Sequence, residues 1–95
     1  PKAAMSSGIS RFDRAAATEL DLRGLTVDEA LDRTDKFLDD ARLSGLDQLT
    51  IIHGKGTGAL RAAIHSHLKA CRDVKSFRLG VYGEGEMGVT VIELK

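Results

Sequence analysis

Leu49-Thr50-Ile51-Ile52-His53-Gly54-Lys55-Gly56-Thr57-Gly58-Ala59-Leu60-Arg61 is the stretch that decides the fold. It begins with an apolar run typical of a strand, and residues 59–64 have the composition of a helix. Three alternating glycines between them allow the backbone to turn several amide N–H groups toward one ligand. The start of the helix adds unpaired N–H donors and the positive end of the helix dipole. The stretch therefore predicts a strand, an anion-binding loop and a helix.

The side chains of this loop suit phosphate chemistry. His53 supplies a ring that titrates near neutral pH, whereas Lys55 and Arg61 supply fixed positive charge. The spacing is neither that of a Walker A motif nor that of the G-x-G-x-x-G dinucleotide fingerprint, which removes the usual nucleotide-binding interpretations. The alternative is a tight turn without a ligand. As a phosphate site, the loop would bind through Gly54, Lys55, Gly56, Thr57, Gly58 and Arg61.

Outward from this loop, the sequence predicts six elements. Polar and apolar residues alternate over 19–23, as in a half-buried strand. Thr26 and Glu29 form a capping box that starts an amphipathic helix, and Gly45 offers a left-handed cap at its end. The remaining elements are a strand over 49–53, a helix starting near Gly58, a strand over about 76–81 and a strand over 89–94.

The order β-α-β-α-β-β predicts an α/β fold: a two-layer sandwich of a mixed four-stranded sheet with both helices on one face. Two strand-helix-strand units imply right-handed crossovers and a largely parallel sheet, with the last two strands antiparallel. Ligands gather beyond the carboxyl ends of parallel strands. We therefore expect the loop that begins at Arg23 and the loop that begins at His53 to converge, if their strands are neighbours.

Composition bounds the function only loosely. The chain has 95 residues, enough for one domain, with 14 basic and 14 acidic side chains. Residues 26–45 carry six acidic and three basic side chains, whereas residues 46–80 carry six basic and two acidic ones. The glycine loop thus lies in the basic half of the chain. The acidic side of the first helix is interpreted as a solvated face.

Other features concern cellular context and boundaries. Cys71 is the only cysteine, which excludes an internal disulfide, fits a reducing cytoplasmic compartment and favours a small buried hydrophobic role. The sequence has no stretch of about 20 apolar residues, so no membrane partner is expected. Residues 1–18 lack periodicity and are interpreted as a flexible linker or tail of a longer chain, followed by a domain over 19–95.

Each candidate site residue has a structural alternative. His53 could instead be a structural histidine satisfied by a backbone carbonyl. Arg23 would clamp phosphate and Asp21 would orient a base, a water or a metal, unless the two form an ordinary surface ion pair. His67 fits a core or boundary position, and His65 is expected on the solvated side.

A built-in metal site has little support in the sequence. Two-metal nucleases need several convergent carboxylates, and only Asp21 is firmly near the loop. Glu84 and Glu86 would contribute only if their connection folds inward. No metal ligands are assigned, and Mg²⁺ or Mn²⁺ stays an open cofactor.

Leu20-Asp21-Leu22-Arg23-Gly24, joined to the run from His53 to Gly58, closely resembles the Smr (small MutS-related) domain over residues 19–95. The resemblance implies a fold like the C-terminal domain of the third bacterial translation initiation factor, with nicking endonuclease or RNA-cleaving activity. Many family members have histidine where this chain has Arg23. The arginine form resembles the subgroup linked to a MutS-like ATPase associated with suppression of recombination.

The leading hypothesis is a DNA nicking endonuclease in recombination suppression or DNA repair, with His53, Asp21 and Lys55 as catalytic residues. DNA, branched DNA included, and the MutS-like ATPase domains of a parent chain are the expected partners. The second hypothesis is a DNA- or RNA-binding module without chemistry. A third is RNA cleavage, or association with the ribosome. Few aromatic residues are present, so phosphate contacts rather than base stacking would carry the affinity.

Overall fold

The computed structural model describes residues 18–81 and 86–95, and it contains the predicted elements in the predicted order. The linker predicted over residues 1–18 lies outside the described residues, apart from Thr18. The elements are β2 (Glu19–Asp21), α1 (Val27–Leu43), β3 (Gln48–Ile52), α2 (Ala59–Lys69), β4 (Val74–Leu79), the 3-10 turn η2 (Glu86–Gly88) and β5 (Val89–Leu94). No helix among these residues is long and apolar enough to cross a membrane.

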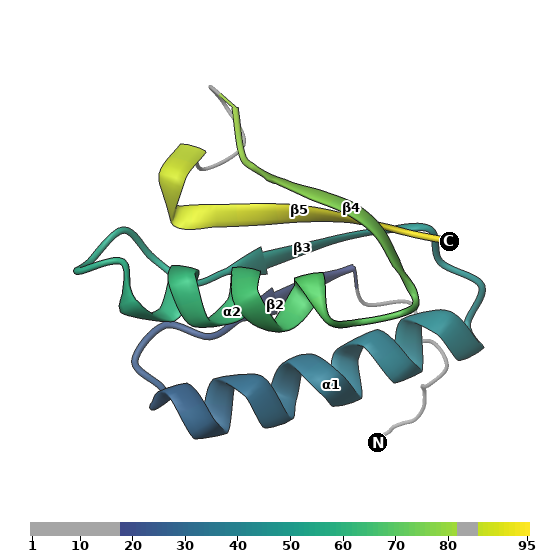
Figure 1. The fold of residues 1–95 in the computed structure, drawn as a ribbon, viewed down its shortest axis with the longest axis horizontal. Coiled ribbons are helices and arrows are strands. Elements are labelled where there is room, and N and C mark those ends of the chain that lie inside the picture. Colours follow the sequence, from purple (N-terminus) through teal and green to yellow (C-terminus); the bar gives the residue numbers. More distant parts are fainter. Residues whose placement is uncertain (1–17, 82–85) are drawn as a thin grey trace, which may run out of the picture.

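The sheet is mixed, with the strand order β2-β3-β5-β4. β2 pairs with β3 in parallel, whereas β5 lies between β3 and β4 and runs antiparallel to both. The expected antiparallel pairing of the last two strands is confirmed. The expectation of a largely parallel sheet is wrong at the level of strand pairs, because the insertion of β5 leaves only one parallel pair (Figure 1).

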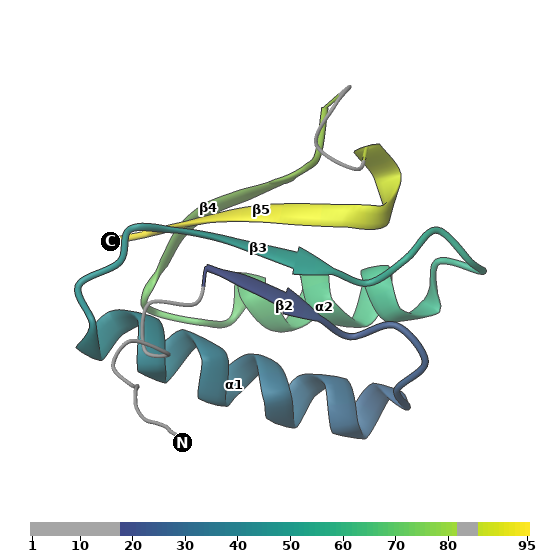
Figure 2. The same ribbon diagram turned by 180° about the vertical axis from the view of Figure 1, so that it is seen from behind.

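Both helices cover the same face of the sheet, as expected, and Figures 1 and 2 show this from opposite sides. The core lies between the two layers. Its buried members come from β3, β4, β5 and both helices, together with the residue after β2: Leu22, Ala30, Phe37, Leu38, Ala41, Leu49, Ile51, Ile64, Leu68, Val74, Ile92 and Leu94. Burial alternates along β3, so every second residue of this strand faces the helices.

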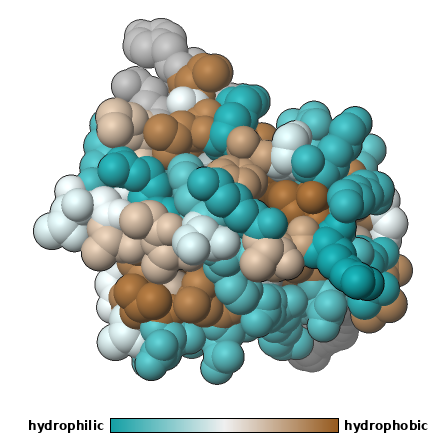
Figure 3. All heavy atoms as spheres, in the orientation of Figure 1, coloured by the Kyte–Doolittle hydropathy of each residue, from teal (hydrophilic) through white to brown (hydrophobic). Residues whose placement is uncertain are grey.

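The outer surface of the helix layer is solvated. The aspartates of α1 are all exposed, which confirms the interpretation of its acidic side. Figure 3 shows apolar side chains in separate groups divided by hydrophilic ones on this side of the molecule.

The ends of α1 are fixed by the predicted local signals. The Thr26 hydroxyl accepts from the Glu29 amide, and the Glu29 carboxylate accepts from the Thr26 amide at 2.9 Å. At the other end, Gly45 has φ of +75°, and the amides of Gly45 and Leu46 donate to the last turn of the helix. These two caps set where the chain enters β3.

Candidate phosphodiester site

The loops that follow β2 and β3 lie side by side at one end of the sheet. The Leu22 amide donates to the Ile52 carbonyl at 2.8 Å, so the parallel pairing continues past the end of β2. Beyond it, the side chain of Arg23 crosses Gly54, where a Cβ would lie 3.3 Å from the Arg23 Cγ. The expected convergence of the two loops is confirmed, and glycine at position 54 is what allows the close approach.

A pocket of about 240 Å³ opens between these loops and the start of α2. The helix begins at Gly58, whose φ of +87° favours glycine and which offers no side-chain cap. The Ala59 amide donates to Oγ1 of Thr57 at 3.3 Å, and the first turn of α2 otherwise presents its amides to the pocket without a cap from Gly58. The lining residues are Gly24, His53, Gly54, Gly56, Thr57, Gly58, Ala59, Leu60 and Arg61.

Of the predicted cations, Arg61 lines this pocket and Lys55 lies in the adjacent glycine loop. Nη2 of Arg61 would be only 2.8 Å from a Cβ at Gly58, so the guanidinium covers the start of its own helix. Lys55 is exposed, and its stem lies against Gly88, where a Cβ would approach the Lys55 Cγ to 3.4 Å. The amide of Gly54 donates to the Gly88 carbonyl at 2.9 Å, which ties the glycine loop to the start of β5.

Arg23 and Asp21 form a bidentate ion pair on the face of the sheet away from the helices. Nε and Nη2 of Arg23 donate to the two Asp21 oxygens at 3.0 and 2.7 Å, and the Arg23 amide also donates to Asp21. The hydrogen bonds from Arg23 lower the pKa of Asp21 to about 2. Asp21 is therefore ionised at neutral pH and orients Arg23; it is a poor proton acceptor. The surface ion pair weighed as the alternative is present.

His53 lies deeper than a residue at the lip of a loop. It continues the inward-facing series Leu49, Ile51, and only 4% of it is exposed. Its Nδ1 is 3.0 Å from the Gly54 carbonyl oxygen and its Nε2 is 2.8 Å from Oγ1 of Thr90 on β5. The carbonyl contact weighed as the structural alternative is therefore present. The ring still lines the pocket, and its catalytic role stays a prediction.

His65 contradicts its predicted position on the solvated side. It is half-buried, its Nε2 lies 2.7 Å from Oγ1 of Thr90, and its ring packs against Phe77. Burial, followed by the nearby positive groups His53, Arg61 and Lys69, lowers the pKa of His65. Sequence reasoning missed Thr90 as well. The signal that could have identified Thr90 is the alternation along the last strand, which places residues 90, 92 and 94 on the helix side.

A family model named the Smr domain matches residues 20–95, with both sequence motifs inside the matched region. The chain belongs to the Smr domain family. It is 58% identical over 88 residues to endonuclease MutS2 of Ruminiclostridium cellulolyticum, covering 93% of this chain and 11% of that protein. It is 63% identical over 81 residues to endonuclease MutS2 of Pelotomaculum thermopropionicum, covering 85% and 10%. The chain thus spans about a tenth of the length of these relatives.

Solved structures agree with the assignment of this Smr domain. The crystal structure of the Smr domain of Thermus thermophilus MutS2 matches with a TM-score of 0.81 and 52% identity, covering 83% of this chain and 99% of that one. YdaL, a stand-alone small MutS-related protein from Escherichia coli, matches with a TM-score of 0.79 and 25% identity, covering 82% and 64%. The expected fold is therefore confirmed.

One group of potential metal ligands occurs among the described residues of the Smr domain. Asp35, His67 and Cys71 have ligand atoms within 4.8 Å of one another, and Nε2 of His67 already contacts Asp35 at 2.6 Å. His67 is nine positions after Gly58, about 14 Å along α2, so this group is remote from the pocket. Glu84 and the side chain of Glu86 lie outside what the structure describes.

Cys71 and His67 lie near their predicted environments. Both are half-buried, and burial, followed by Asp35 and Asp73, raises the pKa of the Cys71 thiol. A boundary position for His67 is confirmed, whereas Cys71 is less buried than expected.

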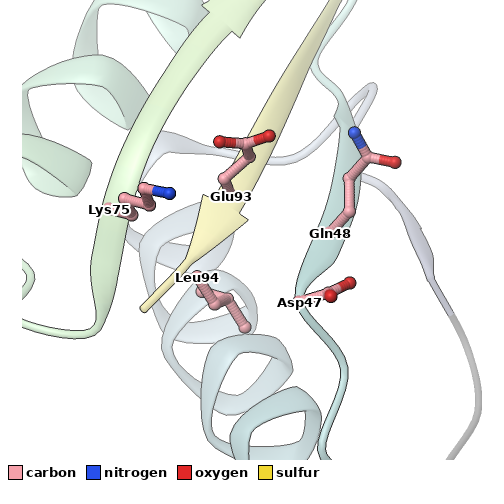
Figure 4. Close-up of a pocket in the computed structure, with 5 residues that line it drawn as sticks. All are labelled: Asp47, Gln48, Lys75, Glu93 and Leu94. Carbon is pink, nitrogen blue, oxygen red and sulfur yellow. The ribbon is translucent and has the colours of Figure 1, made fainter.

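A larger pocket of about 320 Å³ lies at the opposite end of the sheet (Figure 4). It is formed where β3 begins and β5 ends, and its lining mixes charges of both signs: Asp47, Gln48, Lys75, Glu93 and Leu94. The glycine loop and the helix start belong to the other end. This pocket therefore lacks the anion-binding features of the first.

Proposed function

We propose that this Smr domain nicks DNA by cleaving phosphodiester bonds with little base specificity. The observation that carries the proposal is the convergence of the loop after β2, the glycine loop and the start of α2 around one pocket that His53 lines, with Arg23 packed over Gly54 beside it. The relatives named endonuclease MutS2 support it, because this domain is the part of them that the chain matches.

Each residue is assigned a role that suits its chemistry. Arg23 and Lys55 would neutralise the scissile phosphate, and the glycine amides with the first turn of α2 would bind its oxygens. Asp21 holds the Arg23 guanidinium in a fixed plane, so we assign it the orientation of that clamp. His53 would be the proton-transfer group at the leaving oxygen, with Nδ1 as the nitrogen on the loop side.

The wider setting is part of the same proposal. We place the domain in a MutS2-like chain that acts in recombination suppression or DNA repair, with branched DNA as one substrate. Electrostatic binding to phosphates predicts that affinity falls steeply with salt and varies little with base sequence.

The test is nicking of supercoiled plasmid by the 95-residue chain, with His53→Ala compared against His67→Ala. Loss of a proton-transfer group lowers rates by about 100-fold or more, so His53→Ala is expected to nick at least that much more slowly. His67→Ala removes a histidine of α2 that does not line the pocket and is expected to keep the rate. Runs in EDTA, Mg²⁺ and Mn²⁺ establish the metal requirement, and thermal unfolding confirms that both variants fold. Equal rates for the two variants would refute the role of His53.

The second candidate function is nucleic-acid binding without cleavage, and the burial of His53 favours it. Both ring nitrogens have partners within the protein, so the ring is satisfied without a substrate. A preparation that shifts DNA in a gel but yields no nicks under any metal condition would support this function. Cleavage of an RNA strand, with the 2′-deoxy strand of the same sequence left intact, would instead indicate a ribonuclease.

A further inference from the structure

Thr90 joins two histidines that come from different elements. Its Oγ1 lies 2.8 Å from Nε2 of His53, at the end of β3, and 2.7 Å from Nε2 of His65, on α2. The two rings meet edge to face with centroids 6.0 Å apart. Thr90 is fully buried, so its hydroxyl depends on these partners.

The Gly54 carbonyl fixes the direction of the hydrogen bonds. A carbonyl only accepts, so Nδ1 of His53 carries a proton and donates it to Gly54. When the ring is neutral, Nε2 must therefore accept, and Thr90 donates to it. The Thr90 oxygen is then free to accept from Nε2–H of His65. All three of these side-chain contacts are satisfied in this arrangement.

The same three residues also satisfy a charged His53. Nε2–H of the charged ring would donate to Thr90, and Thr90 would donate to Nε2 of His65 in its other tautomer. A hydroxyl can reverse its direction by rotation, whereas a fixed donor or acceptor could serve only one charge state. We propose that Thr90 and His65 are positioning residues whose reversible hydrogen bonds hold the buried ring of His53 in either charge state.

The contacts of the His53 ring are with neutral oxygens and with one other titratable ring. Hydrogen bonds to the Gly54 carbonyl and the Thr90 hydroxyl hold it, and the ring of His65 meets it edge to face. The other titratable and charged groups of the neighbouring elements are Arg61 and Lys69 on α2, Arg23 and Asp21 after β2, and Lys55 in the glycine loop.

The test follows the His53 ring by ¹⁵N NMR as pH is varied, in the intact 95-residue chain. Thr90→Val keeps the shape of the side chain and removes its hydroxyl. The loss of this hydrogen-bond partner destabilises the charged His53 ring more than the neutral one. The midpoint of the His53 titration is expected to fall by about one pH unit. Thr90→Ser keeps the hydroxyl and is expected to restore it. A Thr90→Val midpoint equal to that of the wild type would overturn the proposal.

Variants of His65 give a second, independent test of the proposal. His65→Gln retains a donor and an acceptor for Thr90 and is expected to titrate like the wild type. His65→Leu removes both and is expected to lower the midpoint as Thr90→Val does. Equal behaviour of the two variants would overturn the role of His65. Because NMR needs no substrate, a wild type that never nicks would refute the proposed function and leave this test intact.

Discussion

At the residue scale, the clearest feature of the site is the ion pair that Arg23 forms with Asp21. Its guanidinium binds both oxygens of Asp21, an ion pair with more than half of the Arg23 side chain exposed. Exposed ion pairs contribute little to stability, so geometry is the main effect of this one. Asp21 holds Arg23 across Gly54 of the glycine loop and offsets part of its charge.

Asp21→Asn separates these two effects. We expect tighter DNA binding at low salt, since one negative charge is lost, together with slower nicking, since the guanidinium loses its fixed plane. Asp47→Asn, at the far end of the sheet, changes the net charge equally and serves as the control. Fluorescence anisotropy across salt concentrations and plasmid nicking measure the two effects. If both variants nicked at the same rate, Asp21 would have no orienting role.

His65 predicts how stability depends on pH. Its pKa is lower in the folded protein than the ordinary value of 6.5, because burial and neighbouring positive charges disfavour the charged ring. The unfolded chain therefore binds more protons, and the free energy of unfolding falls as pH drops below about 6.5. His65→Gln should reduce this fall between pH 7.5 and pH 5, as measured by urea denaturation. An unchanged pH dependence in the variant would contradict the assignment.

At the element scale, the start of α2 matters more for the site than the helix itself. Gly58 combines a left-handed backbone with an Arg61 guanidinium packed where a side chain would be. Gly45, after α1, also has a positive φ but faces open space. The two glycines thus share the backbone requirement and differ only in their surroundings.

Gly58→Ala and Gly45→Ala form a matched pair. Each is expected to lower the free energy of unfolding by about 1–2 kcal/mol, the cost of a left-handed non-glycine residue. Only Gly58→Ala displaces Arg61 and narrows the pocket, so only this variant should weaken DNA binding and nicking. Urea denaturation and anisotropy measure the two quantities. Equal loss of DNA binding in both variants would show that the start of α2 is not part of the site.

At the scale of the whole molecule, the site exists because two parallel strands are neighbours. Local signals in the sequence were enough to predict the order of elements, the capping box and the convergence of the loops after Asp21 and Ile52. The position of β5 between β3 and β4 was beyond such signals, because strand order depends on packing between distant segments. The contact of Thr90 with His53 and His65 follows from that strand order and was missed for the same reason.

The burial of His53 was within reach of the sequence. Leu49 and Ile51 are apolar at alternate positions, and the same alternation places residue 53 on the helix side. The glycine loop, taken alone, predicts instead that the His53 ring lies at the lip of the loop. The structure instead presents His53 as a pocket wall, which makes the cations at the rim the first groups that a phosphate meets.

We propose that Arg23, Lys55 and the glycine loop bind the phosphodiester that is cleaved. The most direct test is the nicking rate of supercoiled plasmid for Arg23→Ala and Lys55→Ala, against Arg72→Ala and Lys36→Ala. Both controls remove an exposed cation away from the pocket and keep the net charge matched. We predict a loss of about tenfold or more for Arg23→Ala and for Lys55→Ala, and rates within about twofold of the wild type for the controls. Equal rates in these two variants and in the controls would contradict the proposal.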